Sequence, residues 1–148
     1  MKIKKPSQWI GIITLAWIAF LIWSSVQPYS RFRFFLQHGI TSDQFHVGAY
    51  GVLAFLFAIC FRSFESVPFF EKRAVAITLF ASLFCLGFGG FTESLQLFVK
   101  SRTADWQDFD FDVMGAILGV ASFWIFSKVL EYFQPRRLLN RDLIKSFR

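Results

Sequence analysis

Four long apolar stretches, separated by short polar segments, dominate the pattern of hydrophobic and polar positions along the chain. A helix rises about 1.5 Å per residue, so about 20 apolar residues are needed to cross about 30 Å of hydrocarbon. We therefore expect a transmembrane helix over each stretch, at about residues 9–26, 43–61, 74–99 and 108–132. The pattern predicts an all-α, integral membrane bundle of four transmembrane helices, with residues 1–148 forming a single membrane domain.

The residues that flank these stretches support the same boundaries. Proline interrupts helices, and it follows the first, second and fourth stretches as Pro28, Pro68 and Pro135. Lysines precede the first stretch and no small-residue cleavage site follows it, so we interpret it as a retained anchor. Amphipathic aromatic rings favour the membrane interface and occur near predicted helix ends, as Trp9, Trp23, Trp106 and Tyr132.

The composition excludes several classes of protein. Hydrophobic residues make up 55% of the chain, charged residues only 18%, and 22 residues are Phe. About a quarter of a soluble domain is charged, so we exclude a soluble enzyme, a disordered chain and a secreted disulfide scaffold. The net charge of +6 would suggest nucleic-acid binding in a soluble protein. Here the basic residues flank apolar stretches, so we expect membrane lipid as the partner and no nucleic acid.

The distribution of Lys and Arg predicts the orientation of the bundle. Cytoplasmic segments carry the excess of these residues. With both termini cytoplasmic, four of them lie outside, Arg31, Arg33, Lys100 and Arg102. Twelve then lie inside: Lys2, Lys4, Lys5, Arg62, Lys72, Arg73, Lys128, Arg136, Arg137, Arg141, Lys145 and Arg148. This predicts an N-in, C-in protein whose basic cytoplasmic tail, residues 135–148, either lies on the anionic inner leaflet or only fixes the topology.

Three of the four stretches carry polar residues on one helical stripe each. Ionisable groups at membrane depth are expensive and usually face the interior of a bundle. With this topology, all the stripes lie in the turns nearest the outer side, so we expect them to line one cleft. They consist of Asp43, His46 and Tyr50 in the second stretch, Glu93 and Gln96 in the third, and Asp108 and Asp112 in the fourth.

Glycines on the same stripes indicate where helices approach each other. Gly115 and Gly119 follow the small-xxx-small spacing that favours close helix contact. Gly89 and Gly90 are expected to allow close approach of another backbone. Asp110 points to the opposite side, and we exclude it from the cleft as an interfacial residue.

The polar residues suggest two kinds of chemistry. In one, His46 and Glu93 act as acid and base while Arg102 binds a phosphate or carboxylate. In the other, a divalent cation lies among the carboxylates, but the spacing matches no established metal motif and we predict no metal. The sequence defines no cofactor. The candidate catalytic residues are His46, Glu93 and Asp108, and the candidate substrate-binding residues are Asp43, Tyr50, Gln96, Arg102 and Asp112.

Structural roles are the alternative for several of these residues. Tyr50 and Gln96 have side chains that also join helices through hydrogen bonds. Asp108 would serve equally as an N-cap of the fourth helix, and Arg102 as an ordinary interfacial residue.

The same residues resemble the VanZ-like family of small bacterial membrane proteins. The resemblance covers about residues 43–119, through the stretches SDQFHVGAY and TESLQLFVKSRTADWQDFDFDVMGAILG. Three departures stand out: Gln44 replaces a frequent Lys, Lys100-Ser101 replaces a usual Pro-Gly, and Asp112 occupies a position where Asn is typical.

This resemblance implies an integral protein of the bacterial cytoplasmic (inner) membrane. The name-giving member is associated with low-level resistance to the glycopeptide teicoplanin. We therefore expect a cell-envelope protein whose cleft binds or modifies a lipid-linked or cell-wall-related substrate, such as a lipid-linked envelope precursor. The alternative is a non-catalytic membrane scaffold or partner-binding protein whose polar residues lock the helix bundle.

Overall fold

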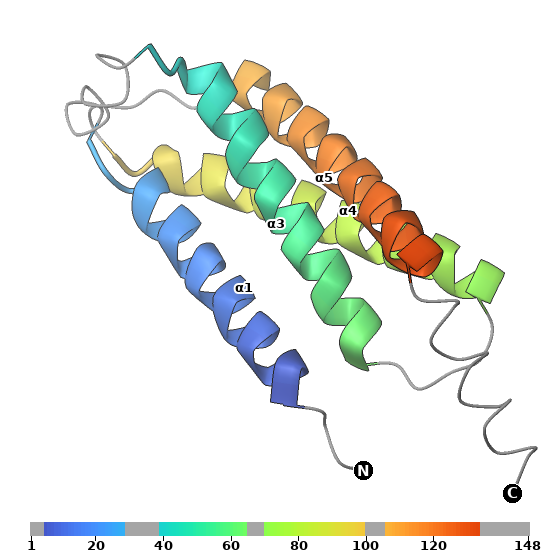
Figure 1. Ribbon diagram of the computed structural model, residues 1–148. Helices are drawn as coiled ribbons and strands as arrows, with labels where there is room; N and C mark the ends of the chain where they lie inside the picture. Colours follow the sequence, from blue (N-terminus) through green and yellow to red (C-terminus); the bar gives the residue numbers. More distant parts are fainter. Residues whose placement is uncertain (1–4, 29–38, 65–69, 100–105, 134–148) are drawn as a thin grey trace, which may run out of the picture.

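Four long helices form the structure, a computed structural model that describes residues 5–28, 39–64, 70–99 and 106–133 (Figure 1). They are α1 (Lys5–Ser25), α3 (Ser42–Phe64), α4 (Phe70–Gln96) and α5 (Trp106–Phe133). These ranges contain no strand. The prediction of an all-α bundle of four helices is confirmed. Pro68, Pro135 and the tail at 135–148 lie outside the described residues.

Each helix contains a segment that is long and apolar enough to cross a membrane. These segments are Gln8–Ser25, Ser42–Arg62, Val75–Gln96 and Trp106–Leu130, which agree closely with the predicted stretches. The clearest difference is that α4 ends at Gln96, three residues before the predicted end at Val99. The amides of Phe98 and Val99 bond carbonyls only three residues back, those of Leu95 and Gln96, so tighter turns close the helix.

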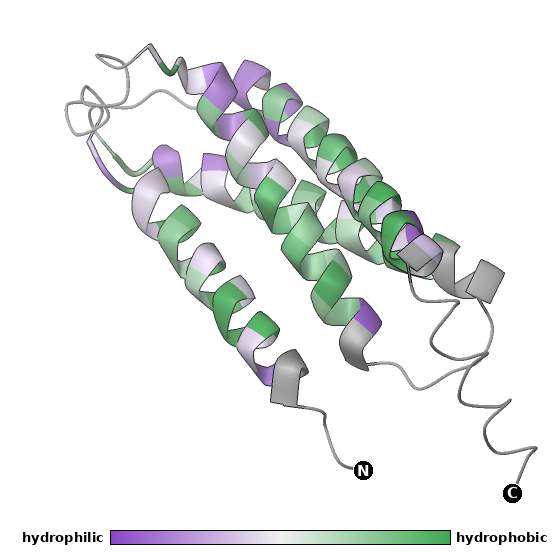
Figure 2. Cartoon of the chain, viewed as in Figure 1, coloured by the Kyte–Doolittle hydropathy of each residue, from purple (hydrophilic) through white to green (hydrophobic). Residues whose placement is uncertain are grey.

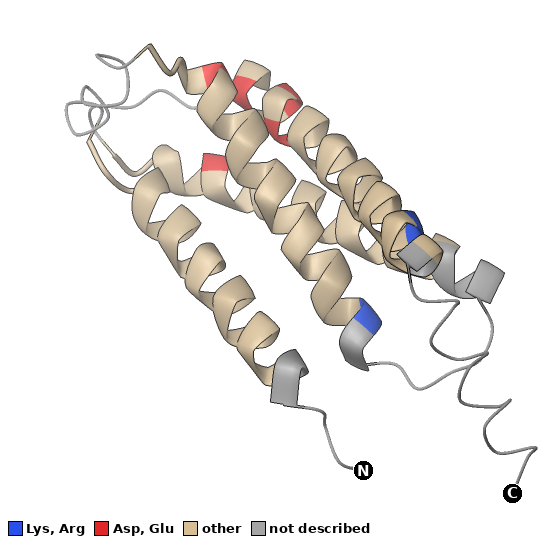
Figure 3. Cartoon of the chain, in the orientation of Figure 1, with Lys and Arg blue, Asp and Glu red and all other residues tan. Residues whose placement is uncertain are grey.

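The helices run alternately up and down, which brings three helix ends together. The first turn of α3, the last of α4 and the first of α5 lie at one end of the bundle, which we call the His46 end (Figure 1). Figure 3 shows that the Asp and Glu residues drawn in red, those whose side chains the structure describes, gather there, whereas Arg62 and Lys128 lie at the opposite end, the Arg62 end. The expectation that the polar stripes share one depth is confirmed.

A capping box explains why α3 begins at Ser42. The Gln44 amide donates to Thr41 Oγ1, and the Thr41 amide donates to Gln44 Oε1, both at 3.2 Å. This reciprocal pair satisfies two backbone donors that the helix leaves unpaired. Gly39, whose φ is 79°, precedes the cap. Gln44, one of the departures from the family pattern, thus contributes to the start of the helix that carries His46.

Helices α3 and α5 form the most extensive contact of the bundle, and they meet through glycine. A Cβ on Gly115 would overlap the carbonyl of Val47 and lie 3.0 Å from its Cα. A Cβ on Gly119 would overlap the carbonyl of Gly51 and lie 2.9 Å from Ala54 Cβ. The predicted small-xxx-small contact is therefore confirmed as a direct approach of two backbones.

Hydrophobic side chains cover the outside of the bundle. Figure 2 shows hydrophobic residues along the length of the helices and hydrophilic residues at the His46 end. Exposed large hydrophobics occur on all four helices, including Leu15, Val52, Leu83 and Ile125. Lipid is the solvent that accommodates such a surface. The aromatic residues expected near the interfaces are also exposed: Trp9, Trp23, Trp106 and Tyr132.

Hydrogen bonds between neighbouring helices stabilise the rest of the bundle. The indole of Trp17 in α1 donates to the Ala49 carbonyl in α3 at 3.0 Å. The indole of Trp124 in α5 donates to Thr78 Oγ1 in α4 at 3.0 Å. At the Arg62 end, the Arg62 guanidinium donates to Ser127 Oγ at 2.6 Å, joining α3 to α5. Each of these bonds links a donor to one neutral acceptor, as expected of contacts that hold helices together.

Candidate functional site

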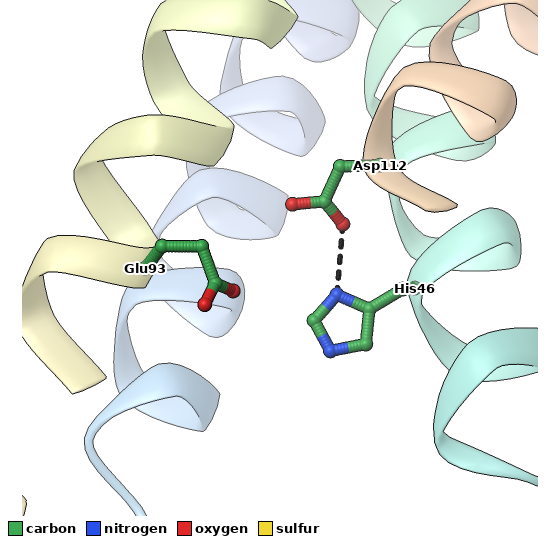
Figure 4. A group of neighbouring side chains, drawn as sticks. All are labelled: His46, Glu93 and Asp112. Atoms are coloured by element: carbon green, nitrogen blue, oxygen red, sulfur yellow. Dashed lines mark hydrogen bonds and ion pairs between the residues drawn. The ribbon is translucent and has the colours of Figure 1, made fainter. Parts of the chain in front are cut away.

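Four ionisable side chains from three helices meet at the His46 end. Helix α3 contributes His46, α4 contributes Glu93, and α5 contributes Asp108 and Asp112. We call these four residues the polar cluster, and Figure 4 shows three of them. The structure therefore brings together all three predicted catalytic residues and one predicted substrate-binding residue, Asp112.

His46 lies between two carboxylates of α5. Its Nδ1 is 2.8 Å from Asp112 Oδ1, and its Nε2 is 3.6 Å from Asp108 Oδ2 (Figure 4 shows the first contact). Asp108 and Asp112 share one face of α5 because they are four residues apart. His46 is 9% exposed and Asp112 only 2%. The two contacts fix the orientation of the imidazole in a largely buried position.

Glu93 faces this pair from α4. Its Oε1 accepts a hydrogen bond of 2.8 Å from the Gln96 amide, one turn away. Its Oε2 is buried, and Figure 4 shows the carboxylate pointing toward His46 and Asp112. His46, Glu93 and Asp112 each offer one possible ligand atom, and these three atoms lie within 4.8 Å of one another. Gln96 therefore positions Glu93 through its hydrogen bond, and its predicted role in substrate binding stays a prediction.

The second oxygen of Asp112 lies against α4. Oδ2 is buried and makes no hydrogen bond of 3.5 Å or less in the part of the chain that the structure describes, although the Tyr50 hydroxyl lies near this carboxylate. A Cβ on Gly89 would lie 3.1 Å from this oxygen, so the missing side chain makes room for it. We expected a backbone to approach Gly89 and Gly90. Instead the Asp112 side chain approaches Gly89, because α4 meets α5 through this carboxylate, and Gly90 has no such neighbour within 4 Å.

Tyr50 lies one turn deeper than His46 and contacts α4. Its hydroxyl is 2.5 Å from Thr92 Oγ1, and Thr92 Oγ1 donates to the Gly89 carbonyl at 2.9 Å. Either hydroxyl can donate in the shorter bond, and the Tyr50 hydroxyl also lies near the Asp112 carboxylate. Sequence reasoning missed Thr92, although it shares the stripe of Gly89, Glu93 and Gln96. For Tyr50 the geometry shows the helix-joining contact that was the structural alternative.

The other predicted positions lie outside the polar cluster. Asp43 is exposed in the first turn of α3, and Asp110 is exposed on α5 as expected. Asp108 lies inside the first turn of α5, which begins two residues earlier at Trp106, so it is not the N-cap. Arg102 lies outside the described residues.

The cluster carries more negative groups than positive ones. Three carboxylates surround one imidazole, and among the side chains that the structure describes His46 is the one group at this end able to carry positive charge. Carboxylates that share a poorly solvated site do not all stay ionised without a compensating cation. The site is therefore suited to exchange protons or to bind a cationic group.

These features define a multi-pass helical membrane protein with an ionisable site at one end of its bundle. A family model described as VanZ/LLP1 matches residues 9–127. The chain belongs to this family, as the polar motifs indicated. No curated protein and no solved structure gives a significant match.

Proposed function

We propose that the chain is an envelope protein of the bacterial cytoplasmic (inner) membrane, whose polar cluster binds or modifies a lipid-linked or cell-wall-related substrate. The observation that carries this proposal is the placement of His46 between Asp108 and Asp112 with Glu93 beside it. The bonds that Trp17 and Trp124 make to neighbouring helices each pair one donor with one neutral acceptor. A buried cluster with three carboxylates costs more than such a contact, which favours a functional role.

The outer location of the site rests on the distribution of basic residues. The 12-to-4 excess of Lys and Arg favours a cytoplasmic location for both termini. The His46 end, where α3 begins and α4 ends, then faces the outside of the membrane. The neighbouring lipid would bring a lipid-linked substrate laterally to the cluster.

The arrangement is suited to acid–base chemistry on such a substrate. An imidazole oriented by carboxylates can accept and return a proton near neutral pH, and Glu93 offers a second group from the facing helix. Arg102 would bind a phosphate or carboxylate of the substrate. In this proposal Asp112 and Asp108 orient His46, and Gln96 orients Glu93. Asp43, exposed at the same end, would contact the part of the substrate that extends into water.

A pair of matched variants tests this function. Asp108→Asn and Asp110→Asn make the same chemical change two residues apart on α5, at a half-buried and an exposed position. In a strain that lacks its own copy, we expect Asp108→Asn and His46→Gln to fail to restore the wild-type envelope phenotype, which is read first as increased sensitivity to teicoplanin. Asp110→Asn should retain the wild-type phenotype. Immunoblots of membranes must show that the variants and the wild type are equally abundant. Loss of the protein together with the phenotype would favour the alternative of a non-catalytic membrane scaffold.

A further inference from the structure

We propose that His46, Glu93 and Asp112 bind one divalent transition-metal ion, for which Zn²⁺ is the probe. The sequence predicted no metal because these residues lie on three separate helices and form no local motif. The fold brings them together, with one ligand atom from each within 4.8 Å of the others (Figure 4). An imidazole with two carboxylates is a donor set that suits Zn²⁺ and related ions.

The distances fit a shared ion. Nitrogen and oxygen ligands lie about 2.0–2.2 Å from Zn²⁺, so two ligands of one ion are at most about 4.4 Å apart. The widest separation in the group, up to 4.8 Å, closes with side-chain shifts of a few tenths of an ångström. His46 Nδ1 and Asp112 Oδ1, 2.8 Å apart, would subtend about 85° at an ion 2.1 Å from each. That angle is typical of neighbouring ligands around a five- or six-coordinate ion.

Asp108 lies beside the second ring nitrogen of His46, Nε2, on the opposite side of the imidazole from Asp112. Metal-bound histidines usually direct their second ring nitrogen to a carboxylate, which orients the ring and raises its basicity. His46 Nε2 is 3.6 Å from Asp108 Oδ2 and is therefore already placed for this role. Asp108 thus acts as a positioning residue for His46.

The burial of Asp112 is the second observation that points to a ligand. This side chain is 98% buried, since its exposure is 2%, and Oδ2 makes no hydrogen bond of 3.5 Å or less in the described part of the chain, although the Tyr50 hydroxyl lies near the carboxylate. An unpaired buried carboxylate oxygen is costly, and a cation beside it removes that cost. Gly89 leaves the space that this oxygen occupies. A bound ion would also balance the negative charge of the three surrounding carboxylates.

The metal site deepens the proposed function and is independent of the identity of its substrate. With an ion bound, His46 and Glu93 would be its ligands instead of the acid and base, and the ion would supply a Lewis acid or an activated water at the same position. Metal content and affinity are measured without any envelope substrate. Failure of the metal proposal therefore leaves the envelope function standing, and the converse also holds.

Isothermal titration of the detergent-purified full chain tests the site. A histidine-free affinity tag is used, the protein is stripped with EDTA, and ZnCl₂ is titrated. We expect one saturable site per chain. Asp112→Asn and His46→Gln should weaken binding at least 100-fold, and Asp108→Asn by about 10–100-fold. The exposed carboxylate of Asp110 serves as the control, so Asp110→Asn should bind Zn²⁺ as the wild type does.

Thermal melting separates loss of the site from loss of the fold. Zn²⁺ should raise the Tm of the wild type and of Asp110→Asn, and leave that of Asp112→Asn unchanged. Absence of saturable Zn²⁺ binding by the wild type overturns the proposal, whatever the variants do. Wild-type affinity in Asp112→Asn, or equal loss in Asp110→Asn, also overturns it, since the ion would then bind elsewhere.

Discussion

His46 Nδ1 lies 2.8 Å from Asp112 Oδ1, although 66 positions separate these residues in the chain. The contact depends on the packing one turn below it, where Gly115 meets the backbone of Val47. Val47 follows His46 directly, and Gly115 follows Asp112 by three residues. The backbone contact therefore sets the register of α3 against α5 and places the two side chains opposite each other.

Enlarging this glycine should disturb the packing. Gly115→Ala adds a Cβ that overlaps the Val47 carbonyl, and overpacking of this kind costs about 1–3 kcal/mol. We expect Tm in detergent to fall by several degrees. Gly48→Ala is the control, because a Cβ there meets nothing within 4 Å. Equal Tm values for the two variants would contradict the close backbone contact.

The bond between Arg62 and Ser127 should contribute to stability without contributing to function. Ser127→Ala removes the hydroxyl that accepts from the guanidinium at 2.6 Å, and we expect a loss of about 0.5–1.5 kcal/mol. Ser94→Ala is the control, because its exposed hydroxyl bonds only the Gly90 carbonyl within α4. Melting curves of the two variants measure the difference. Loss of the envelope phenotype in a stable Ser127→Ala protein would show that the functional region extends beyond the polar cluster.

The orientation of the bundle is open to labelling of single cysteines. With Cys60 and Cys85 replaced by Ala, Asp43→Cys is expected to react with a membrane-impermeant maleimide in intact cells. Lys128→Cys, at the Arg62 end, should react only after the cells are permeabilised. Both predictions follow from the excess of Lys and Arg on the cytoplasmic side. The reverse labelling pattern would place the polar cluster in the cytoplasm and remove its access to outer-leaflet substrates.

Much of the fold was predictable because few backbone structures are stable in the hydrocarbon of a membrane. Backbone groups in hydrocarbon must bond within their own helix, so length and hydropathy nearly determine the elements. The Gly115–Gly119 contact was also predictable, since small residues at this spacing allow backbones to meet. The predicted end of α4 was three residues too late. The apolar residues that follow Gln96 cannot be told from helical residues by their hydropathy.

The sequence predicted which residues gather at the site better than it predicted which of their side chains touch. Shared depth brought His46, Glu93 and Asp112 to one end, but the rotation of each helix decides which side chains touch. For this reason Asp43, on the same stripe as His46, remained exposed. Thr92 was missed because a hydroxyl in an apolar stretch carries little signal, although it bonds Tyr50.

The central claim is that the polar cluster is a functional site and not a lock between helices. Two variants at adjacent positions of α4, Glu93→Gln and Thr92→Val, test this claim. The measurement is the Tm of each variant in detergent buffer that contains EDTA. Glu93→Gln keeps the shape and the acceptor for Gln96 while removing a negative charge beside Asp112, whereas Thr92→Val removes the bond to Tyr50.

Functional residues are often held at a cost to stability, so Glu93→Gln should melt at the wild-type Tm or above it. Thr92→Val should melt about 2–4 °C lower, as expected for the loss of about 1 kcal/mol. A fall in the Tm of Glu93→Gln as large as that of Thr92→Val would contradict the account and show that the cluster holds the helices together.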